Sequence, residues 1–179
     1  MEFLKCQNVK RLALKREMGM IYRVKQFFQA VFAKLNRDDE VLINTYLNEQ
    51  ERKLFYKLPK SEQVHSVRVA RDVLKASLEC GCYDVLLIKA ALLHDIGKID
   101  SGLNSVTKSI MVILDKILKK KLQKYKNIKL VRHYYDHPKI ALKYLVNDNE
   151  YLKFLIENHH NYGIVDRKLQ LLQRADCNN

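Results

Sequence analysis

Apolar residues recur at three- and four-residue steps along most of the chain, which is the spacing of amphipathic helices. The clearest example is residues 21–35, whose aliphatic and aromatic positions form one continuous helical face. Strict alternation over the length of a strand is missing, and so are hairpin signals such as Asn-Gly or Asp-Gly. The pattern predicts an all-α protein, a bundle of about seven or eight helices when an N-terminal extension is included.

Residues that favour helix ends divide the first half of the chain. Asn48 and Glu51 form a capping-box pattern for a short helix that ends before Pro59. Ser61 is expected to cap the next helix and Gly81 to end it. The chain is therefore expected to change direction near residues 59 and 81.

Later helices carry polar residues at their ends. Asp84 is expected to cap a helix over residues 85–96, which is apolar nearly all round and should lie at the centre of the domain. A longer helix over 105–125 becomes strongly basic, and Pro138 is expected at the first position of another, directly after His137. The last two helices are expected to follow the caps Asp148 and Asp166.

Length and composition point to a single packed domain. The chain has 179 residues, 47% hydrophobic and 30% charged, with five glycines and two prolines. No apolar stretch approaches the roughly 20 residues of a membrane span. The basic N-terminus has no clean hydrophobic core, so no signal peptide and a cytoplasmic location are expected. In that compartment we expect free thiols at Cys6, Cys80, Cys82 and Cys177.

The net charge of +13 is concentrated in two segments. Residues 1–37 carry nine Lys or Arg against two Glu, and residues 115–135 carry eight against one Asp. Such zones favour an anionic substrate or partner, or they are solvated helix faces that keep the protein soluble. Nucleic-acid binding is not expected, because the sequence holds no known reader motif and the charge alone does not supply one.

Six histidines occur, and five of them fall at or near predicted helix ends in the second part of the chain. Imidazole and carboxylate groups are ligands for divalent metals such as Mn, Fe, Co, Ni or Zn. His94 and Asp95 interrupt the most apolar helix, where a buried carboxylate needs a cation or a firm hydrogen-bond partner. Each histidine taken alone also fits a core or helix-end role, and His133 is expected to be structural or on the surface.

Several of these residues occur in a recognisable order. His65 is followed by His94-Asp95 within Leu-Leu-His-Asp-Ile-Gly-Lys and finally by Asp176 within Arg-Ala-Asp. This order resembles the HD superfamily of metal-dependent phosphohydrolases over residues 61–179. His137 and the pair His159-His160 look like the additional histidines of its binuclear branch, which includes the HD-GYP cyclic-dinucleotide phosphodiesterases. The resemblance implies an HD-type helical bundle, with residues 1–60 as a basic amphipathic extension.

The resemblance also implies roles for individual residues. It makes Asp95 a bridge between two divalent metal ions, whose element it does not decide among Mn, Fe, Ni, Co, Zn and Mg. Lys98 matches a lysine that contacts a substrate phosphate oxygen, so Asp95 and Lys98 are the residues expected to act in catalysis. The ligands implied for the first ion are His65, His94, Asp95 and Asp176. Those that complete the second site are His137, His159 and His160.

The sequence departs from the family pattern at two places, and these departures bear on the substrate and on the number of metal ions. After the paired histidines the chain reads Asn-Tyr-Gly, so Tyr162 and Gly163 are at most a remnant of the Gly-Tyr-Pro signature. Cyclic di-GMP is therefore not the expected substrate. In members with three metals an acidic ligand stands one turn before the first histidine, but Ser61 occupies that position here and Glu62 is one step away. Two metal ions are expected rather than three.

The function implied is hydrolysis of a nucleotide-type phosphate ester by a metal-activated water, as a phosphomonoesterase or a phosphodiesterase. The alternative is a non-catalytic HD module that binds a nucleotide or a protein partner. Residues 1–60 have no counterpart in these motifs. Their apolar face, with Phe27, Phe28 and Phe32, favours a homodimer, while a lid or a membrane-surface contact stays open.

Overall fold

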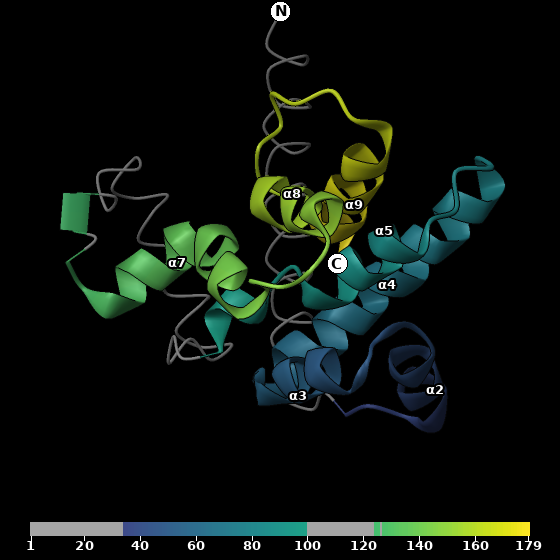
Figure 1. Ribbon diagram of the computed structural model, residues 1–179, viewed down its shortest axis with the longest axis horizontal. Coiled ribbons are helices and arrows are strands. Elements are labelled where there is room, and N and C mark those ends of the chain that lie inside the picture. The colour runs from purple at the N-terminus through teal and green to yellow at the C-terminus, as the bar shows by residue number, and fades with distance from the viewer. Residues whose placement is uncertain (1–33, 100–123, 126) are drawn as a thin grey trace, which may run out of the picture.

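The computed structural model of the protein describes residues 34–99, 124–125 and 127–179. Within these ranges it contains seven α-helices, two short 3-10 segments and no strand, which confirms the prediction of an all-α fold (Figure 1). The helices predicted over 21–35 and 105–125 lie outside the described residues apart from their last positions. The phenylalanine face predicted for dimerisation lies outside them as well. No helix in the described ranges is both long enough and apolar enough to cross a membrane.

The first two described helices, α2 (Arg37–Tyr46) and α3 (Glu49–Lys57), begin with the same capping pattern. The predicted capping box of α3 is confirmed, because the Asn48 side chain accepts the N–H of Glu51 and the Glu51 carboxylate accepts the N–H of Asn48. Ile43 and Phe55 are fully buried in the same core as the later helices. That core therefore includes residues on both sides of position 60.

Helix α5 (Val85–Leu93) lies at the centre of the molecule, as its apolar sequence predicts. It packs along α4 (Lys60–Glu79), and Figure 1 shows the two helices side by side. Asp84 caps α5 by accepting the N–H of Leu86 at 2.8 Å. The helix is shorter than predicted: it ends at Leu93, and a turn leads into the 3-10 segment η1 (Ile96–Lys98). Asp95 is thus placed on a tight turn rather than within the last turn of the helix.

Two predictions about the ends of α4 are wrong: the cap at Ser61 and the free thiols of Cys80 and Cys82. Pro59, not Ser61, is the N-terminal cap residue of this helix. After α4 the chain turns at Gly81 with a left-handed φ of 64°, which glycine adopts without strain. The turn brings Cys80 and Cys82 to a Cα–Cα distance of 5.4 Å, and a disulfide joins them, so the prediction of free thiols is wrong for this pair. Cys177 is free and exposed, and Cys6 lies outside the described residues.

Helix α8 (Glu150–Asn158) packs on α5, and α9 (Arg167–Asn178) packs mainly on α4 and also on α5. Asp166 caps α9 as predicted, whereas the cap of α8 is Asn149 rather than its neighbour Asp148. The apolar faces of both helices enter the central core through leucines and an isoleucine. The fully buried ones are Leu155, Ile156, Leu169 and Leu172.

Helix α7 (Lys129–Ala141) continues into the 3-10 segment η3 (Leu142–Tyr144) and packs mainly on η1. Pro138 lies inside α7, so the prediction that it starts a helix is wrong. Proline has no N–H to donate to the carbonyl of Tyr134 four residues earlier. Nδ1 of His137 lies 3.2 Å from that oxygen and takes the place of the missing donor.

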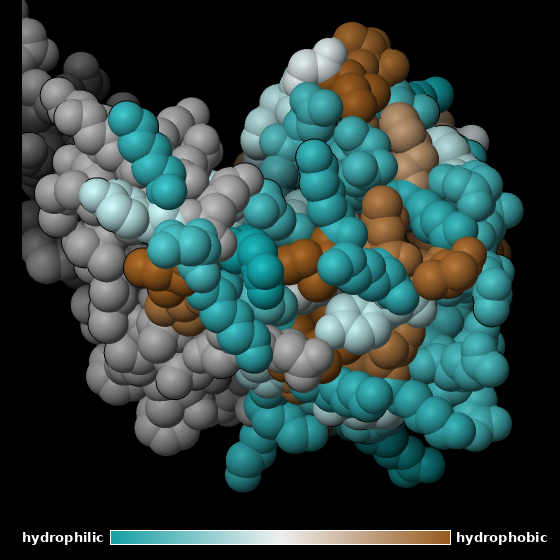
Figure 2. All heavy atoms as spheres, turned by 60° about the vertical axis from the view of Figure 1, so that its left-hand side comes forward, coloured by the Kyte–Doolittle hydropathy of each residue, from teal (hydrophilic) through white to brown (hydrophobic). Residues whose placement is uncertain are grey.

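Figure 2 brings the α7 side of the molecule forward, and hydrophilic side chains dominate its described surface.

Candidate metal centre

The structure brings together all seven residues for which the sequence predicts a metal-binding role. They come from five places in the fold: α4, the turn after α5, α7, the C-terminal end of α8, and α9. Donor atoms within 4.8 Å of one another form three overlapping groups that could hold a metal ion. These groups are His65 with His94 and Asp95, His94 with His159 and Asp176, and His137 with His159 and His160.

The two oxygens of Asp95 face different histidines. Oδ2 lies 3.3 Å from Nε2 of His94 and 3.9 Å from Nε2 of His65, whereas Oδ1 lies 3.3 Å from Nε2 of His137. Asp95 is 1% exposed, so neither oxygen is directed at bulk solvent. This carboxylate therefore stands between two sets of nitrogen donors.

Asp176 closes the cluster from the side of α9. Its Oδ1 lies 3.0 Å from Nε2 of His65 and 3.6 Å from Nε2 of His94. Its Oδ2 lies 3.7 Å from Nδ1 of His160, whose side chain is 46% exposed. The cluster is consequently buried on the α5 and α8 side and reaches solvent beside His160.

Backbone carbonyls orient three of the histidines in the same way. Nδ1 of His94 lies 2.9 Å from the Ala91 oxygen, and Nδ1 of His159 lies 2.7 Å from the Ile156 oxygen. His137 repeats the arrangement with Tyr134. Since a carbonyl only accepts, each Nδ1 carries a proton and each Nε2 faces the cluster. Metal-binding histidines are commonly oriented by this kind of outer hydrogen bond.

Two buried polar atoms of the cluster lack a hydrogen-bond partner among the described residues. They are Nε2 of His94 and Oδ1 of Asp95, and both are inaccessible to solvent. Unsatisfied polar atoms at such depth are rare and costly. A divalent cation would satisfy an imidazole lone pair and a carboxylate oxygen together, so this donor set fits a metal ion.

The electrostatics of the cluster give Asp95 and His159 the protonation states that metal ligands need. Burial opposes the charged form of Asp95, but the neighbouring His94 and Lys98 hold the pKa of its carboxyl well below the ordinary value. Burial and the nearby His94, His160 and His137 keep the pKa of His159 well below its usual range. Asp95 is thus an anion and His159 a neutral imidazole at neutral pH, as metal binding requires. At His94, burial lowers the pKa but the carboxylates of Asp95 and Asp176 raise it to about 10, so a metal ion would displace a proton there.

A family model for the HD domain matches residues 63–177. The chain belongs to the HD domain family. Neither the search of curated proteins nor the search of solved structures gives a match. HD domains are typically metal-dependent phosphohydrolases and bind divalent metals. The matched residues span the whole cluster described above, from α4 to α9.

Lys98, the residue expected to contact a substrate phosphate, lies directly beside Asp95. Its Nζ lies 2.5 Å from Oδ2 of Asp95 and 3.1 Å from Oε2 of Glu62, and the residue is 6% exposed. The ammonium is therefore held between two buried carboxylates. The sequence gives no sign of Glu62 as its partner, because the two residues are distant in the chain and the contact exists only after folding.

Gly97 and His133 also contribute, by fixing α7 beside η1. A Cβ on Gly97 would lie 1.9 Å from the carbonyl oxygen of His137 and 2.9 Å from the nitrogen of Ala141. Nδ1 of His133 lies 3.1 Å from the Gly97 oxygen, and His133 is buried. The structural role expected of His133 is the one observed. Both contacts place α7 at the distance from which His137 reaches Asp95.

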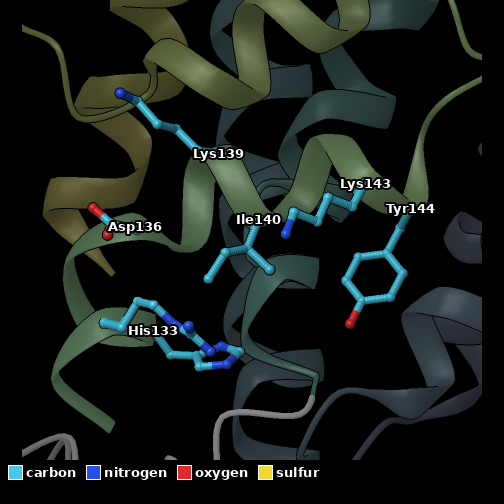
Figure 3. Close-up of a pocket in the computed structure, with 7 residues that line it drawn as sticks. His133, Asp136, Lys139, Ile140, Lys143 and Tyr144 are labelled. Atoms are coloured by element: carbon cyan, nitrogen blue, oxygen red, sulfur yellow. The ribbon is translucent and has the colours of Figure 1, made fainter. Parts of the chain in front are cut away.

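A pocket of about 570 Å³ adjoins the flank of α7 and η3. Figure 3 shows His133, Ile140, Lys143 and Tyr144 directed towards a common space, while the Lys139 side chain extends away from these residues. Arg132, Lys139 and Lys143 form no ion pair with any of the described residues. The pocket therefore combines positive charge with aromatic and aliphatic surface on the helix that also carries His137. Its lining residues are Arg132, His133, Asp136, Lys139, Ile140, Lys143 and Tyr144.

Proposed function

We propose that the chain is a metal-dependent phosphohydrolase that cleaves a nucleotide-type phosphate ester, with two divalent ions at the cluster. The observation that carries this proposal is the position of Asp95, whose oxygens face His94 on one side and His137 on the other at 3.3 Å each. A carboxylate between two groups of nitrogen donors could serve as a shared ligand of two metal ions. When bound, such ions supply charge stabilisation for the phosphoryl group and lower the pKa of water.

The chain's own residues would hold and shield this centre. His65, His94 and Asp176 would serve one ion, and His137, His159 and His160 the other. Burial of His94, His137 and His159 keeps bulk water from competing for these nitrogens, while the exposed edge of His160 gives the substrate access. Asp176 lies 3.0 Å from Nε2 of His65 and 3.7 Å from Nδ1 of His160, so it stands at the outer edge of both ligand sets.

The α7 pocket supports a substrate larger than inorganic phosphate. Its volume of about 570 Å³ is in the range of small-molecule pockets, which run from roughly 300 to 1,000 Å³. Arg132 and Lys143 would balance phosphate charge, and the ring of Tyr144 with Ile140 offers apolar surface for a base or a similar group. A phosphorylated compound with a planar or apolar portion therefore suits the site best.

Elemental analysis of protein purified without chelator or a nickel column tests the proposal. We expect about two metal equivalents per chain in the wild type and almost none in Asp95→Ala, while Asp38→Ala, an exposed position on α2, keeps the wild-type content. About one equivalent would leave a mononuclear hydrolase. Absence of metal after reconstitution with Mn or Fe contradicts the proposal and favours a non-catalytic HD module.

Substrate tests would then separate the two kinds of phosphate ester. The metal-loaded protein is assayed with p-nitrophenyl phosphate as a monoester and with bis(p-nitrophenyl) phosphate as a diester, followed by nucleotides of the preferred kind. Hydrolysis that disappears in Asp95→Ala assigns the activity to this centre. A protein that binds two ions but cleaves neither ester class overturns the catalytic part of the proposal.

A further inference from the structure

One buried carboxylate beside the cluster has no place among the groups of potential metal ligands. Glu62 is 4% exposed, and its Oε2 lies 3.1 Å from Nζ of Lys98. None of the three ligand groups found in the described ranges includes it. It stands on α4 three residues before His65, so one helix carries both a cluster histidine and this separate acid.

The position of Lys98 creates a conflict for metal binding. Its Nζ lies 2.5 Å from Oδ2 of Asp95, and the same oxygen faces His94 at 3.3 Å. A cation bound at that oxygen would meet the ammonium at close range in a buried setting, where like charges repel more strongly than in water. The ammonium must then have another carboxylate close by, because an unpaired buried charge is costly.

Glu62 supplies that second carboxylate. We propose that Glu62 is a positioning residue that holds the Lys98 ammonium away from Asp95 when a divalent metal ion binds there. The proposal rests on the proposed function, because it requires Asp95 to be a metal ligand. In the metal-free state Lys98 neutralises both Asp95 and Glu62. In the metal-bound state the ion neutralises Asp95, and Lys98 remains paired with Glu62 without leaving the buried site.

Removal of the Glu62 charge should therefore weaken metal binding without removing any ligand. In Glu62→Gln the carboxylate that would hold Lys98 away from Asp95 is lost, so the ammonium and the metal ion compete for Oδ2 of Asp95. The double variant Glu62→Gln with Lys98→Met lacks both the Lys98 ammonium, which competes with the metal ion, and the Glu62 carboxylate that accepts from it. Metal affinity should then return to the wild-type value, because neither charge is left without its partner.

Calorimetric titration of Mn²⁺ into the chelator-stripped full chain measures this effect directly. We expect the Kd to rise about 10–100-fold in Glu62→Gln, the usual loss for a residue that supports a metal ligand. The double variant is expected to bind Mn²⁺ as tightly as the wild type. Such a restoration would not occur if Glu62 only stabilised the fold.

Glu51→Gln is the matched control. Glu51 is also a buried acid, 2% exposed, and its Oε1 lies 2.6 Å from Nζ of Lys89 between α3 and α5. The substitution removes the charge of an equivalent buried ion pair outside the cluster. We expect it to lower the thermal stability of the protein and to leave the Mn²⁺ affinity unchanged.

The outcomes separate this inference from the proposed function. If the wild type binds Mn²⁺, Asp95→Ala does not, and Glu62→Gln binds as tightly as the wild type, the inference is wrong and the metal centre stands. A double variant as weak as Glu62→Gln also overturns the inference. If the wild type binds no Mn²⁺, or Asp95→Ala binds it equally well, both proposals fail.

Discussion

Gly97 and His137 approach so closely that a single added carbon atom would collide: a Cβ on Gly97 would lie 1.9 Å from the His137 carbonyl oxygen. The contact joins η1, which follows the Asp95 turn, to the helix that carries His137. Since backbone atoms on both sides make the contact, no flexible side chain can move aside. The separation between Asp95 and His137 thus depends on a residue without a side chain.

Gly97→Ala is therefore expected to push α7 away from η1 and to separate His137 from Asp95. Overpacking of this kind costs about 1–3 kcal/mol of stability, and a shift of about 1 Å at a reacting centre can cost on the order of 100-fold in rate. Thermal unfolding and hydrolysis rates measure the two effects. Gly163→Ala is the control, since its Cβ would meet nothing closer than 3.5 Å. Equal activity in both variants would show that α7 does not need this contact.

Local signals in the sequence predicted much of the fold. The Asn48–Glu51 capping box, the cap at Asp84 and the cap at Asp166 are all present. Each depends only on a short polar side chain that accepts a backbone N–H two or three residues later, so the local sequence is enough to predict it. Pro138 shows where such reasoning fails. Proline is favoured at the start of a helix, but here the ring nitrogen of His137 donates to the carbonyl that proline leaves without a donor.

Contacts between distant residues left no comparable signal. The order of histidines and aspartates, through the family resemblance, indicated which residues come together and that Asp95 stands between the sets of His94 and His137, but it did not indicate which carbonyls orient these histidines. The pairing of Glu62 with Lys98 was likewise not evident from either local sequence, because α4 and η1 meet only in the folded chain. Such contacts depend on the packing of whole helices rather than on spacing along one helix.

Lys98→Met should destabilise the metal-free protein strongly. It removes the only ammonium within hydrogen-bond distance of Asp95 among the described residues, and it takes the same ammonium from the buried carboxylate of Glu62. Breaking a buried pair in this way costs about 3–5 kcal/mol. Urea denaturation of chelator-stripped protein checks the value, and added Mn²⁺ should restore more stability to the variant than to the wild type.

The matched comparison for this prediction is Lys53→Met. Lys53 pairs with Glu49 on the surface of α3, where the two side chains are 69% and 72% exposed. Loss of such a pair changes stability by no more than about 0.5 kcal/mol. If Lys98→Met behaves like Lys53→Met, the buried carboxylates are neutralised in some other way.

The charge of Asp84 stabilises the start of α5, and this stabilisation is expected to be lost in acid. Burial raises the pKa of its carboxyl, but the hydrogen bond from Lys168 at 2.5 Å and the N–H of Leu86 lower it to a net value below the ordinary 3.8. A carboxyl with a lowered folded pKa stabilises the protein above 3.8, and this contribution is lost as the pH falls through the folded pKa. Acid should therefore weaken the start of the central helix.

Asp84→Asn tests this dependence, because asparagine also caps helices but carries no charge. Urea unfolding at pH 7 should show the variant to be less stable by up to about 1 kcal/mol, as for a partly exposed ion pair. Between pH 4 and 2 the difference should shrink, since the wild type then loses the same charge. A difference that stays constant over this range would mean that Asp84 does not titrate as described.

Substitutions in the α7 pocket are expected to change KM for a nucleotide substrate and to leave kcat nearly unchanged. Arg132→Glu and Lys143→Glu place negative charge where the phosphate-bearing part of a nucleotide is proposed to lie, and neither residue is among the cluster ligands. Loss of a hydrogen bond to a charged group costs about 1.5–3 kcal/mol, so KM for a nucleotide substrate should rise at least about tenfold. The value of kcat should change little, because the interaction contributes equally to the ground state and the transition state.

Two comparisons assign that effect to the pocket rather than to overall charge. Lys75→Glu makes the same charge change at an exposed position of α4 outside the pocket, so it reports the general attraction of an anion to a chain with a net charge of +13. A compact substrate such as p-nitrophenyl phosphate should reach the metal centre without filling the pocket, and its KM should be nearly unaffected. If Lys75→Glu raises the nucleotide KM as much as Lys143→Glu does, the charge acts at long range. The pocket is then not the place where the nucleotide binds.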